Sequence, residues 1–442
     1  RTPAAVALKG AVKRAIGPTR TRALKTRLGR GGAGATASAR PLGGAAHRPR
    51  PALPTRVERP GINLIGYLSA ETGMGEAARG LLRALRAADI PCAARDVDLN
   101  VLARRGDARF VDRVQADTPL PYDVNLLVAN ADQVLPLHDH LGPEVFGGRL
   151  SVGLWLWELE RFPDRYLPAF DVLHEVWTPS TFCLDAIAAE SPIPVRRVPL
   201  PIEMPDAPAH DRAHFELPDD AFVFLFLFNF LSYRARKNPD GLIEAFRRAF
   251  AAGDPTPADG PTPLLLIKTS HADFAPEALL ALRAAADGAN VRIVDGYADR
   301  DAIDSLMAHC DAYVSLHRSE GFGLTVAEAM ALGKPVVATA YAGVTDFFHA
   351  GNGFPVRHSL VTLRDDEGPY PAGARWAEPQ IDDAARQMRR IYGDPATARA
   401  RGGLAQADII QQLSPAAVGA LLRRRLDALL RRVERGQLGA AL

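Results

Sequence analysis

The chain has 442 residues, of which 47% are hydrophobic and 24% charged, and this composition predicts a soluble globular protein of two ordinary domains with additional segments. The longest apolar run, Ala221–Phe228, is much shorter than the roughly 20 residues that span a bilayer, so no transmembrane helix is predicted. The three cysteines, Cys92, Cys183 and Cys310, are odd in number and lack metal-ligand spacing. They indicate reduced thiols in a cytosolic protein and argue against a disulfide scaffold or a zinc site.

The net charge of +2 hides an asymmetry between the first 60 residues and the rest of the chain. Residues 1–60 carry fourteen Lys and Arg against one acidic residue, Glu58, so this segment has a net charge of +13 and the remainder −11. Its glycines and prolines predict a disordered leader in which Ala4–Arg27 forms a basic helix. Three roles stay open for the leader: a solubilising tail, a segment that adsorbs to anionic lipid, and an arm that binds nucleic acid.

From Gly61 onward, short apolar runs alternate with amphipathic stretches. Ile62–Leu68 is predicted as a buried strand and Glu76–Ala88 as a helix with one apolar face. Further strands are predicted at 123–128, 150–155 and 175–178. Because alternating strands and helices require crossover connections, we expect a parallel sheet in an α/β fold.

Four prolines within Pro199–Pro208 indicate a stiff linker, and a second α/β series follows it. Its strands are predicted at 222–228, 264–268, 291–294, 312–316 and 336–339, and its helices at 239–252, 276–286, 303–309 and 325–332. The chain ends with a predicted basic amphipathic helix, Pro415–Arg435. We therefore expect a leader (1–60), a first domain (61–205), a second domain (206–414) and a C-terminal segment (415–442) that packs back on the first domain.

The densest chemistry lies in Leu316–Pro335, where a predicted strand runs into a glycine-bearing turn and then a short helix. Amides at the start of such a helix bind phosphate or another anion, and glycines let the ligand approach the backbone. The residues expected to contribute are Gly321, Phe322, Gly323, Leu324 and Thr325. The pattern lacks the third glycine of a dinucleotide-binding fingerprint, which argues against a dehydrogenase.

Two carboxylates stand eight positions apart, Glu320 before the predicted helix and Glu328 within it. This Glu-x7-Glu spacing, in Ser-Glu-Gly-Phe-Gly-Leu-Thr-Val-Ala-Glu-Ala-Met-Ala-Leu-Gly-Lys-Pro, resembles the signature of retaining, family-4 type nucleotide-sugar glycosyltransferases, the glycosyl transferases group 1. The resemblance implies a GT-B fold. In that fold two Rossmann-like domains face a cleft. The resemblance implies that the first domain (61–205) binds the acceptor and that the second domain (206–414) holds most of the nucleotide-sugar donor.

The same resemblance implies roles for both carboxylates: Glu320 would contact the donor hexose, and Glu328 the ribose hydroxyls of the nucleotide. For Glu320 the alternative is a solvated carboxylate in a turn. For Glu328 the alternative is structural. Thr325 and Glu328 have the spacing of a capping box, in which the glutamate satisfies an amide at the helix start.

The resembled family also places an Arg and a Lys after the first strand of the second domain, where they grip the donor diphosphate. Lys237 fits the lysine, whereas the expected arginine falls on an uncharged residue, so Arg234 or Arg236 is a candidate substitute. Lys268, at the end of another predicted strand, is a weaker candidate, and a solvated basic turn is the alternative for residues 234–237. Because no Asp-x-Asp metal motif stands in a suitable place, we expect Lys, Arg and helix amides to neutralise the diphosphate, with no metal and no cofactor.

In the first domain, Gly73 and Gly75 lie in a predicted loop that can bring the backbone close to the donor phosphates or the acceptor; a tight turn without a ligand is the alternative. Trp155 and Trp157 follow a central strand, and aromatic faces stack on sugar rings. This segment resembles bacterial mannosyl- and rhamnosyl-type transferases of surface polysaccharides. Many relatives have a His after this strand. Here Glu158 is the candidate polar group near the reacting centre, with a structural ion pair as the alternative.

Together these features predict a retaining transferase that moves a hexose from a nucleotide diphosphate sugar to a glycan or lipid-linked acceptor in cell-surface polysaccharide synthesis. We expect it in the cytoplasm, peripheral to the inner face of the membrane if the leader binds anionic lipid, and we expect no nucleic-acid partner. A GT-B nucleotide-sugar epimerase and a degenerate sugar-binding subunit are the alternatives. An epimerase would form product without an acceptor, and a degenerate subunit would not hydrolyse the donor.

Overall fold

The computed structural model describes residues 50–54, 56–99, 102–107, 109, 117–204, 207–250 and 260–435. The first 49 residues of the predicted leader, with the helix predicted at Ala4–Arg27, lie outside them. The end of the leader is packed: Leu53 and Val57 contact the hydrophobic core, and the amides of Glu58 and Arg59 donate to Asp123. The packed chain therefore begins before Gly61, where it was expected to start.

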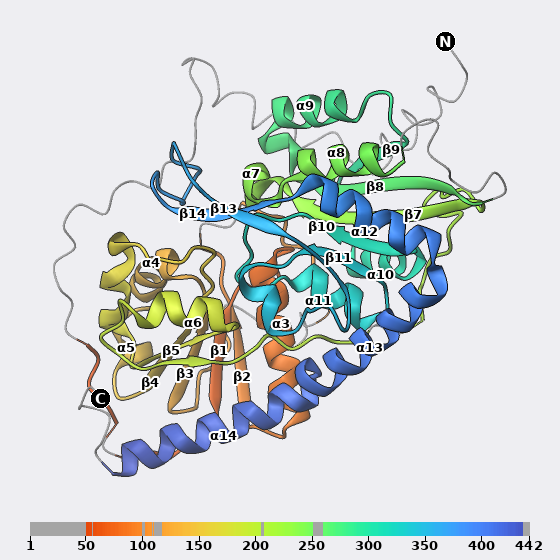
Figure 1. Ribbon diagram of the computed structural model, residues 1–442. Coiled ribbons are helices and arrows are strands. Elements are labelled where there is room, and N and C mark those ends of the chain that lie inside the picture. Colours follow the sequence, from red (N-terminus) through yellow and green to blue (C-terminus); the bar gives the residue numbers. More distant parts are fainter. Residues whose placement is uncertain are drawn as a thin grey trace, which may run out of the picture. The chain divides into compact units, whose positions relative to one another are not determined.

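The first half contains a parallel sheet whose described strands follow the order β2-β1-β3-β4-β5-β6 (Figure 1). The strands are β1 (Ile62–Gly66), β2 (Cys92–Asp96), β3 (Val124–Val128), β4 (Leu150–Leu154), β5 (Glu175–Thr178) and β6 (Val195–Arg197). The helices are α3 (Gly73–Ala87), α4 (Ala131–Leu141), α5 (Pro143–Phe146), α6 (Thr181–Ala188) and the 3-10 helix η2 (Asp164–Val172). β1 and β3 are buried along their whole length, as expected for parallel strands covered on both faces.

The second half repeats this plan, with described strands in the order β12-β11-β10-β7-β8-β9. The strands are β7 (Ala221–Asn229), β8 (Thr262–Ser270), β9 (Val291–Asp295), β10 (Ala312–Ser315), β11 (Val336–Thr339) and β12 (Phe354–Val356). An antiparallel hairpin of β13 (His358–Thr362) and β14 (Arg375–Pro379) follows. The helices are α7 (Arg234–Lys237), α8 (Pro239–Ala249), α9 (Pro276–Ala286), α10 (Arg300–His309), α11 (Leu324–Ala331), α12 (Ile381–Gly393), α13 (Pro395–Leu413) and α14 (Pro415–Glu434), with the 3-10 helices η3 (Phe230–Ser232), η4 (Ala272–Phe274) and η5 (Ala342–Asp346).

The last helix of the chain returns to the first half. Figure 1 shows α13 leaving the second half and α14 running along the first sheet, where α14 packs against α3. The guanidinium of Arg423 donates to the carbonyl of Ala88, and Arg432 pairs with Glu175 (3.2 Å). All described residues belong to the same compact unit.

The predicted strands and helices of both halves are present, with shifted ends. β1 ends at Gly66 and not at Leu68, α3 begins at Gly73 and not at Glu76, and α8 stops three residues before the predicted end at 252. The prediction missed β2, β6, β12, the β13–β14 hairpin and the helices α4, α5, α6, α7, α12 and α13. β2 and β6 are edge strands, so they lack the long apolar runs that identify central strands.

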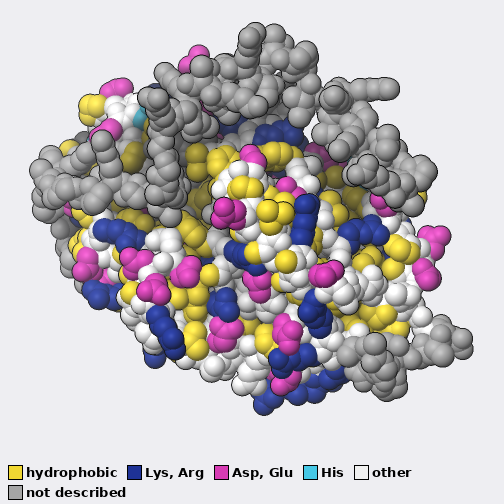
Figure 2. Space-filling view, turned by 90° about the horizontal axis from the view of Figure 1, so that it is seen from above, with side chains coloured by type: hydrophobic (Ala, Val, Ile, Leu, Met, Phe, Trp, Pro, Cys, Tyr) yellow, Lys and Arg dark blue, Asp and Glu magenta, His cyan; other side chains and the backbone are white. Residues whose placement is uncertain are grey.

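No described helix is long and apolar enough to cross a membrane. Figure 2 shows that on the described part of the face seen from above, basic, acidic and hydrophobic side chains are interspersed.

Candidate active site

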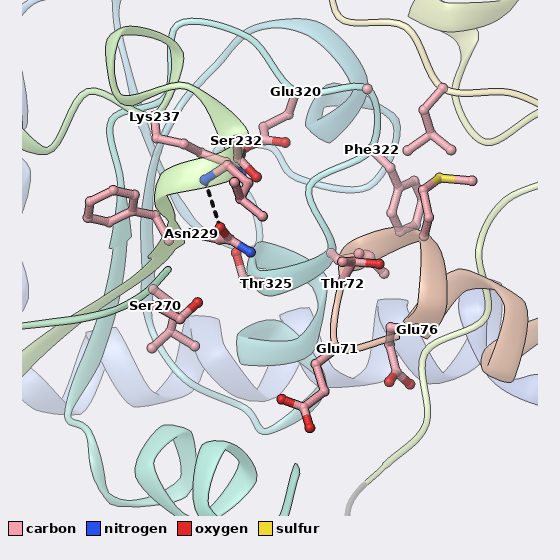
Figure 3. A pocket seen from close by; sticks show the side chains of 18 of the residues that line it. Glu71, Thr72, Glu76, Asn229, Ser232, Lys237, Ser270, Glu320, Phe322 and Thr325 are labelled. Carbon is pink, nitrogen blue, oxygen red and sulfur yellow. Dashed lines mark hydrogen bonds and ion pairs between the residues drawn. The ribbon is translucent and has the colours of Figure 1, made fainter. Parts of the chain in front are cut away.

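A cavity of about 610 Å³ lies at the carboxyl ends of the strands of both sheets (Figure 3). From the first half it is lined by residues that follow β1, β3 and β4, and from the second half by residues that follow β7, β8, β9 and β10. Ligands of parallel α/β folds bind at this edge. The predicted site residues that line the cavity are Gly73, Glu158, Arg236, Lys237, Lys268, Glu320, Gly321, Phe322, Gly323, Leu324, Thr325 and Glu328.

Glu320 lies in the turn after β10, with its carboxylate between two cations. Lys237 pairs with one carboxylate oxygen, and Arg236 approaches the other at 3.1 Å. Burial opposes the ionisation of Glu320, but the charges of Lys237 and Arg236 prevail and lower its pKa to about 2. Glu320 is therefore an ionised carboxylate at neutral pH, and a solvated turn carboxylate is excluded.

The α11 helix begins directly after this turn. Its N-cap is Gly323, which has a φ of 92°, a left-handed conformation that favours glycine. The side chain of Phe322 is buried against Phe347, with ring centroids 5.3 Å apart, so the turn is fixed by packing. Leu324 and Thr325, in the first turn of the helix, line the cavity, and no described side chain caps the helix start. Unsatisfied amides at this position favour an anion in the cavity.

Glu328 does not cap α11, so the capping-box alternative is wrong. The helix starts at Leu324, which places Thr325 inside its first turn, and the Thr325 hydroxyl is bonded instead to the hydroxyl of Tyr313 (2.7 Å). The carboxylate of Glu328 accepts a hydrogen bond from Arg300 (2.5 Å). Burial raises the pKa of Glu328, and the charge of Arg300 opposes this rise.

Arg300, which the sequence prediction missed, lies between carboxylates of the two halves. It pairs with Glu328 of the second half. Its charge, followed by those of nearby arginines, also lowers the pKa of Glu76 of the first half well below the ordinary range, although burial acts in the opposite direction. The arginines paired with Glu76 are Arg79 (3.0 Å), Arg83 (2.5 Å) and Arg109 (3.0 Å). Among these pairs only Glu76 and Arg79 have the spacing of an ion pair within one helix turn, so no sequence pattern indicates the others.

Of the two remaining predicted cations, Lys268 and Arg234, only Lys268 lines the cavity. Lys268 lines the cavity, but its ammonium donates to the carbonyls of Thr269 (2.9 Å) and Gly296 and so joins the ends of β8 and β9. Arg234 does not line the cavity. Its guanidinium pairs with Asp240 and donates to a carbonyl of α9. Arg236 and Lys237, and not Arg234, are thus the basic residues of α7 that the structure brings to Glu320.

Of the two glycines predicted to lie in a ligand-binding loop of the first half, only one lines the cavity. Gly73 lines the cavity next to Thr72, the N-cap of α3. Gly75 does not line it. A Cβ at Gly75 would lie 2.1 Å from the carbonyl of Ala70, so the glycine is required by close packing of the turn.

Trp157 and Glu158 reach the cavity, whereas Trp155 does not. Trp155 is fully buried and stacks on Phe162 with ring centroids 5.7 Å apart. The backbone carbonyl of Glu158 accepts a hydrogen bond from the hydroxyl of Ser319. This bond fixes the segment after β4 beside the Glu320 turn.

A second contact between the halves involves Ser180 and Cys183 of α6. The Ser180 hydroxyl donates to the carbonyl of Gly321 (2.7 Å) and accepts from the amide of Cys183 (3.2 Å), so it also caps α6. The Cys183 thiol lies between the carbonyls of Gly321 (3.2 Å) and Trp157 (3.0 Å). Burial raises the pKa of this thiol to about 11, which makes it a packing group and not a nucleophile.

Among the described residues, no group of three or more His, Cys, Asp or Glu side chains could hold a metal ion. The charges that line the cavity include a Glu320 group with Lys237 and Arg236, and a Glu328 group with Arg300.

Residues 209–361 match the family model of the Glycosyl transferases group 1, and this segment contains Lys237, Glu320 and Glu328. HepE from Anabaena, solved in complex with UDP and glucose, has a TM-score of 0.60 and 15% identity over 83% of this chain and 99% of its own. Sucrose-phosphate synthase from Thermosynechococcus elongatus has a TM-score of 0.60 and 18% identity over 84% of this chain and 100% of its own. The comparison with curated proteins gave no match.

These likenesses show the fold. The two halves form a GT-B fold, as the sequence predicted. The match to the group 1 model and the GT-B fold together support a glycosyltransferase.

Proposed function

We propose that this protein is a retaining glycosyltransferase that moves a hexose from a nucleotide diphosphate sugar to a glycan or lipid-linked acceptor. The observation that carries the proposal is the ionised Glu320, held by Lys237 and Arg236 beside the start of α11. This group of charges lies in the segment that matches the group 1 model. HepE, of the same fold, binds UDP and glucose.

In the proposed complex, the diphosphate lies over the N-terminus of α11. Lys237, Arg236 and the amides of the first helical turn stabilise the negative charge that grows on the leaving diphosphate. Glu320 accepts hydrogen bonds from the hexose hydroxyls. Glu328, which Arg300 holds in place, contacts the ribose.

Retention follows from attack on the same face of the sugar as the leaving group. A phosphate oxygen of the leaving diphosphate takes the proton of the acceptor hydroxyl, so no nucleophile from the protein is needed. Lys237 is paired with Glu320 before the donor binds. A diphosphate next to it offers a second anionic partner, so this lysine is placed to follow the charge as the glycosidic bond breaks.

The proposal is tested by a thermal-shift screen of nucleotide sugars, followed by transfer assays with the donor that stabilises the protein most. The anomeric configuration of the product is read by proton NMR: retention supports the mechanism, and inversion contradicts it. Product that forms without an acceptor would indicate the epimerase alternative. Binding without hydrolysis or transfer of the donor would indicate the degenerate subunit. Because we propose that no metal takes part, EDTA should leave the rate unchanged.

The setting of the reaction belongs to the same proposal. We place it at the cytoplasmic face of a membrane, in the synthesis of surface polysaccharide, with the basic leader adsorbed to anionic lipid. The net charge of +13 on residues 1–60 supports this location, because basic segments accumulate at anionic bilayers.

A further inference from the structure

Helix α7, which carries Arg236 and Lys237, is a single turn with little stability of its own. It contains the hydrogen bonds of one turn, donated by the amides of Lys237 (3.1 Å) and Asn238 (2.8 Å). The residues that flank it have positive φ, 61° at Tyr233 and 53° at Asn238, a conformation that is uncommon for residues with a side chain. Because an isolated turn of this kind does not persist in water, contacts from outside the helix must hold it.

Arg318, in the segment between β10 and the Glu320 turn, supplies such contacts. Its amide donates to the carbonyl of Arg236 (2.8 Å), and its guanidinium donates to the carbonyl of Ala235 (2.6 Å). In return, the guanidinium of Arg236 donates to the carbonyl of Ser319 (2.9 Å). Carbonyls at the end of a helix lack intrahelical partners, and here Arg318 satisfies two of them. Arg318 itself does not line the cavity.

The β13–β14 hairpin holds the side chain of Arg318 in turn. The guanidinium pairs with both carboxylate oxygens of Glu378 (2.6 and 2.9 Å). It also lies over the ring of Trp376, 5.7 Å from the ring centroid. The carbonyl of Arg318 accepts a hydrogen bond from the amide of Ala377 (2.9 Å). A bidentate pair of this kind fixes the direction of an arginine fork, so Glu378 and Trp376 direct the guanidinium toward α7.

The hairpin is itself packed on the first half, toward which Figure 1 shows it extending. Leu363, Tyr370 and Trp376 belong to the hydrophobic core of the first half. Arg375 of β14 pairs with Glu160, which follows β4 (2.8 Å). The segment that holds Arg318 is therefore fixed by both halves.

We propose that Arg318 is a positioning residue for the transfer reaction: through the carbonyls of α7, it sets Lys237 and Arg236 where they meet the leaving diphosphate. The proposal rests on the proposed function, which gives the two cations that role, and adds the residue that places them. Without Arg318 both cations are present but loosely placed. A displacement of about 1 Å is enough to cost a preorganised group much of its effect on the reacting charge.

Hydrogen–deuterium exchange of the full chain measures the hold on α7 without a ligand. In Arg318→Met the amides of Lys237 and Asn238 should exchange about tenfold faster than in the wild type, because the turn opens more often. The matched control is Arg375→Met, which removes an arginine of the same hairpin that pairs with the exposed Glu160 and lies outside the cavity. Exchange at α7 should be unchanged in this control.

A second measurement compares nucleotides. UDP, GDP and ADP are titrated by calorimetry, and the diphosphate that binds most tightly is compared with its monophosphate. The wild type should prefer the diphosphate about tenfold, because the cations of α7 contact the second phosphate. Arg318→Met should remove most of this preference, as Lys237→Ala does. In the Lys237→Ala background the effect of Arg318→Met should be smaller, which a general loss of stability would not produce.

If Arg318→Met does not fold, Glu378→Gln replaces it in both measurements, because it leaves Arg318 in place and removes only the charge that directs it. It should lower the preference for the diphosphate about threefold. The proposal is overturned if folded Arg318→Met matches the wild type in exchange at α7 or in its preference for the diphosphate. It is also overturned if Arg375→Met has an equal effect.

Failure of the proposed function has a different signature. In that case the wild type binds none of the three diphosphates and cleaves no nucleotide sugar. Exchange at α7 is still measured: faster exchange in Arg318→Met supports the placement of the cations by Arg318, and equal exchange contradicts it.

Discussion

The hydroxyl of Ser180 donates a hydrogen bond of 2.7 Å to the carbonyl of Gly321, and this bond joins the first half of the protein to the turn that carries Glu320. Ser180 is fully buried. The same hydroxyl caps α6. The position of the Glu320 turn is thus coupled to the start of a helix in the other half.

Replacing Ser180 with Ala should lower transferase turnover about fivefold, because one buried hydrogen bond is worth about 1 kcal/mol. Ser180→Thr keeps the hydroxyl and should restore most of the activity. The informative quantities are kcat and KM for both variants with the melting temperature. A fall in melting temperature with an unchanged kcat would show that Ser180 acts only as the N-cap of α6.

Glu320→Gln should lower turnover about 10²–10³-fold, because it removes one preorganised charge beside the reacting sugar. Lys237→Ala should have an effect of similar size through the leaving diphosphate. Both are compared with Arg234→Ala, a basic residue of α7 outside the cavity. If Arg234→Ala is as damaging as Lys237→Ala, the assignment of the diphosphate-binding cations is wrong.

The pH dependence of stability should carry a contribution from Glu320. Its pKa is about 2 in the folded protein against an ordinary 4.5, so its ion pairs stabilise the fold above pH 4.5, and this contribution is lost as the pH falls toward 2. Urea unfolding of the wild type at pH 7, 5 and 3 should show the loss. In Glu320→Gln the dependence should be flatter, and identical curves for the two proteins would contradict the ion-pair assignment.

Arg300→Met should make nucleotide binding more sensitive to acid. Burial already raises the pKa of Glu328, and Arg300 opposes the rise, so removing the arginine raises that pKa further and protonates the carboxylate at higher pH. Calorimetric titration of the nucleoside diphosphate from pH 5 to 8 should show affinity lost at higher pH in this variant than in the wild type. Arg300→Lys, which keeps the charge, is the control. If the pH dependence of affinity is the same in Arg300→Met and the wild type, the assignment of Glu328 to the ribose is wrong.

Deleting residues 1–49 should reduce association with anionic vesicles and leave turnover of a soluble acceptor nearly intact. Each basic residue near the surface contributes roughly 1 kcal/mol of attraction, which salt weakens. The cut stops before Pro51, because the carbonyl of Pro51 is bonded to the ring of His174 (3.0 Å). Neutral vesicles are the control. Loss of soluble turnover in a folded truncated protein would make the leader part of the catalytic unit.

The sequence predicted the central strands, because β7 carries eight apolar residues in a row and β10 is apolar except for Ser315. It also predicted the Glu320 turn, because Glu320 and Glu328 lie only eight positions apart and their spacing can be read within one segment of the sequence. It could not separate Arg234 from Arg236. Residues two positions apart on a helix point in different directions, and only packing decides which one faces the cavity.

The sequence could not predict the roles of Arg300 and Ser180, for a different reason. Each acts through a partner or neighbour far along the chain, as in the bond between Ser180 and Gly321. The sequence around each of them shows only an ordinary helix start. Contacts of this kind depend on how the two halves are joined, which no local pattern encodes.

Helix α14 follows both halves along the chain but packs against α3 of the first half. On the ribosome, domains near the N-terminus ordinarily fold as units while synthesis continues at about 5–20 residues per second. Here four apolar residues of α14 become available only after the second half has been made: Val418, Leu422, Leu426 and Leu429. The first half therefore completes its fold after the second half has been made, with α3 exposed to chaperones in the interval. A chain released before α14 keeps that surface open, so truncated products are exposed to aggregation and proteolysis.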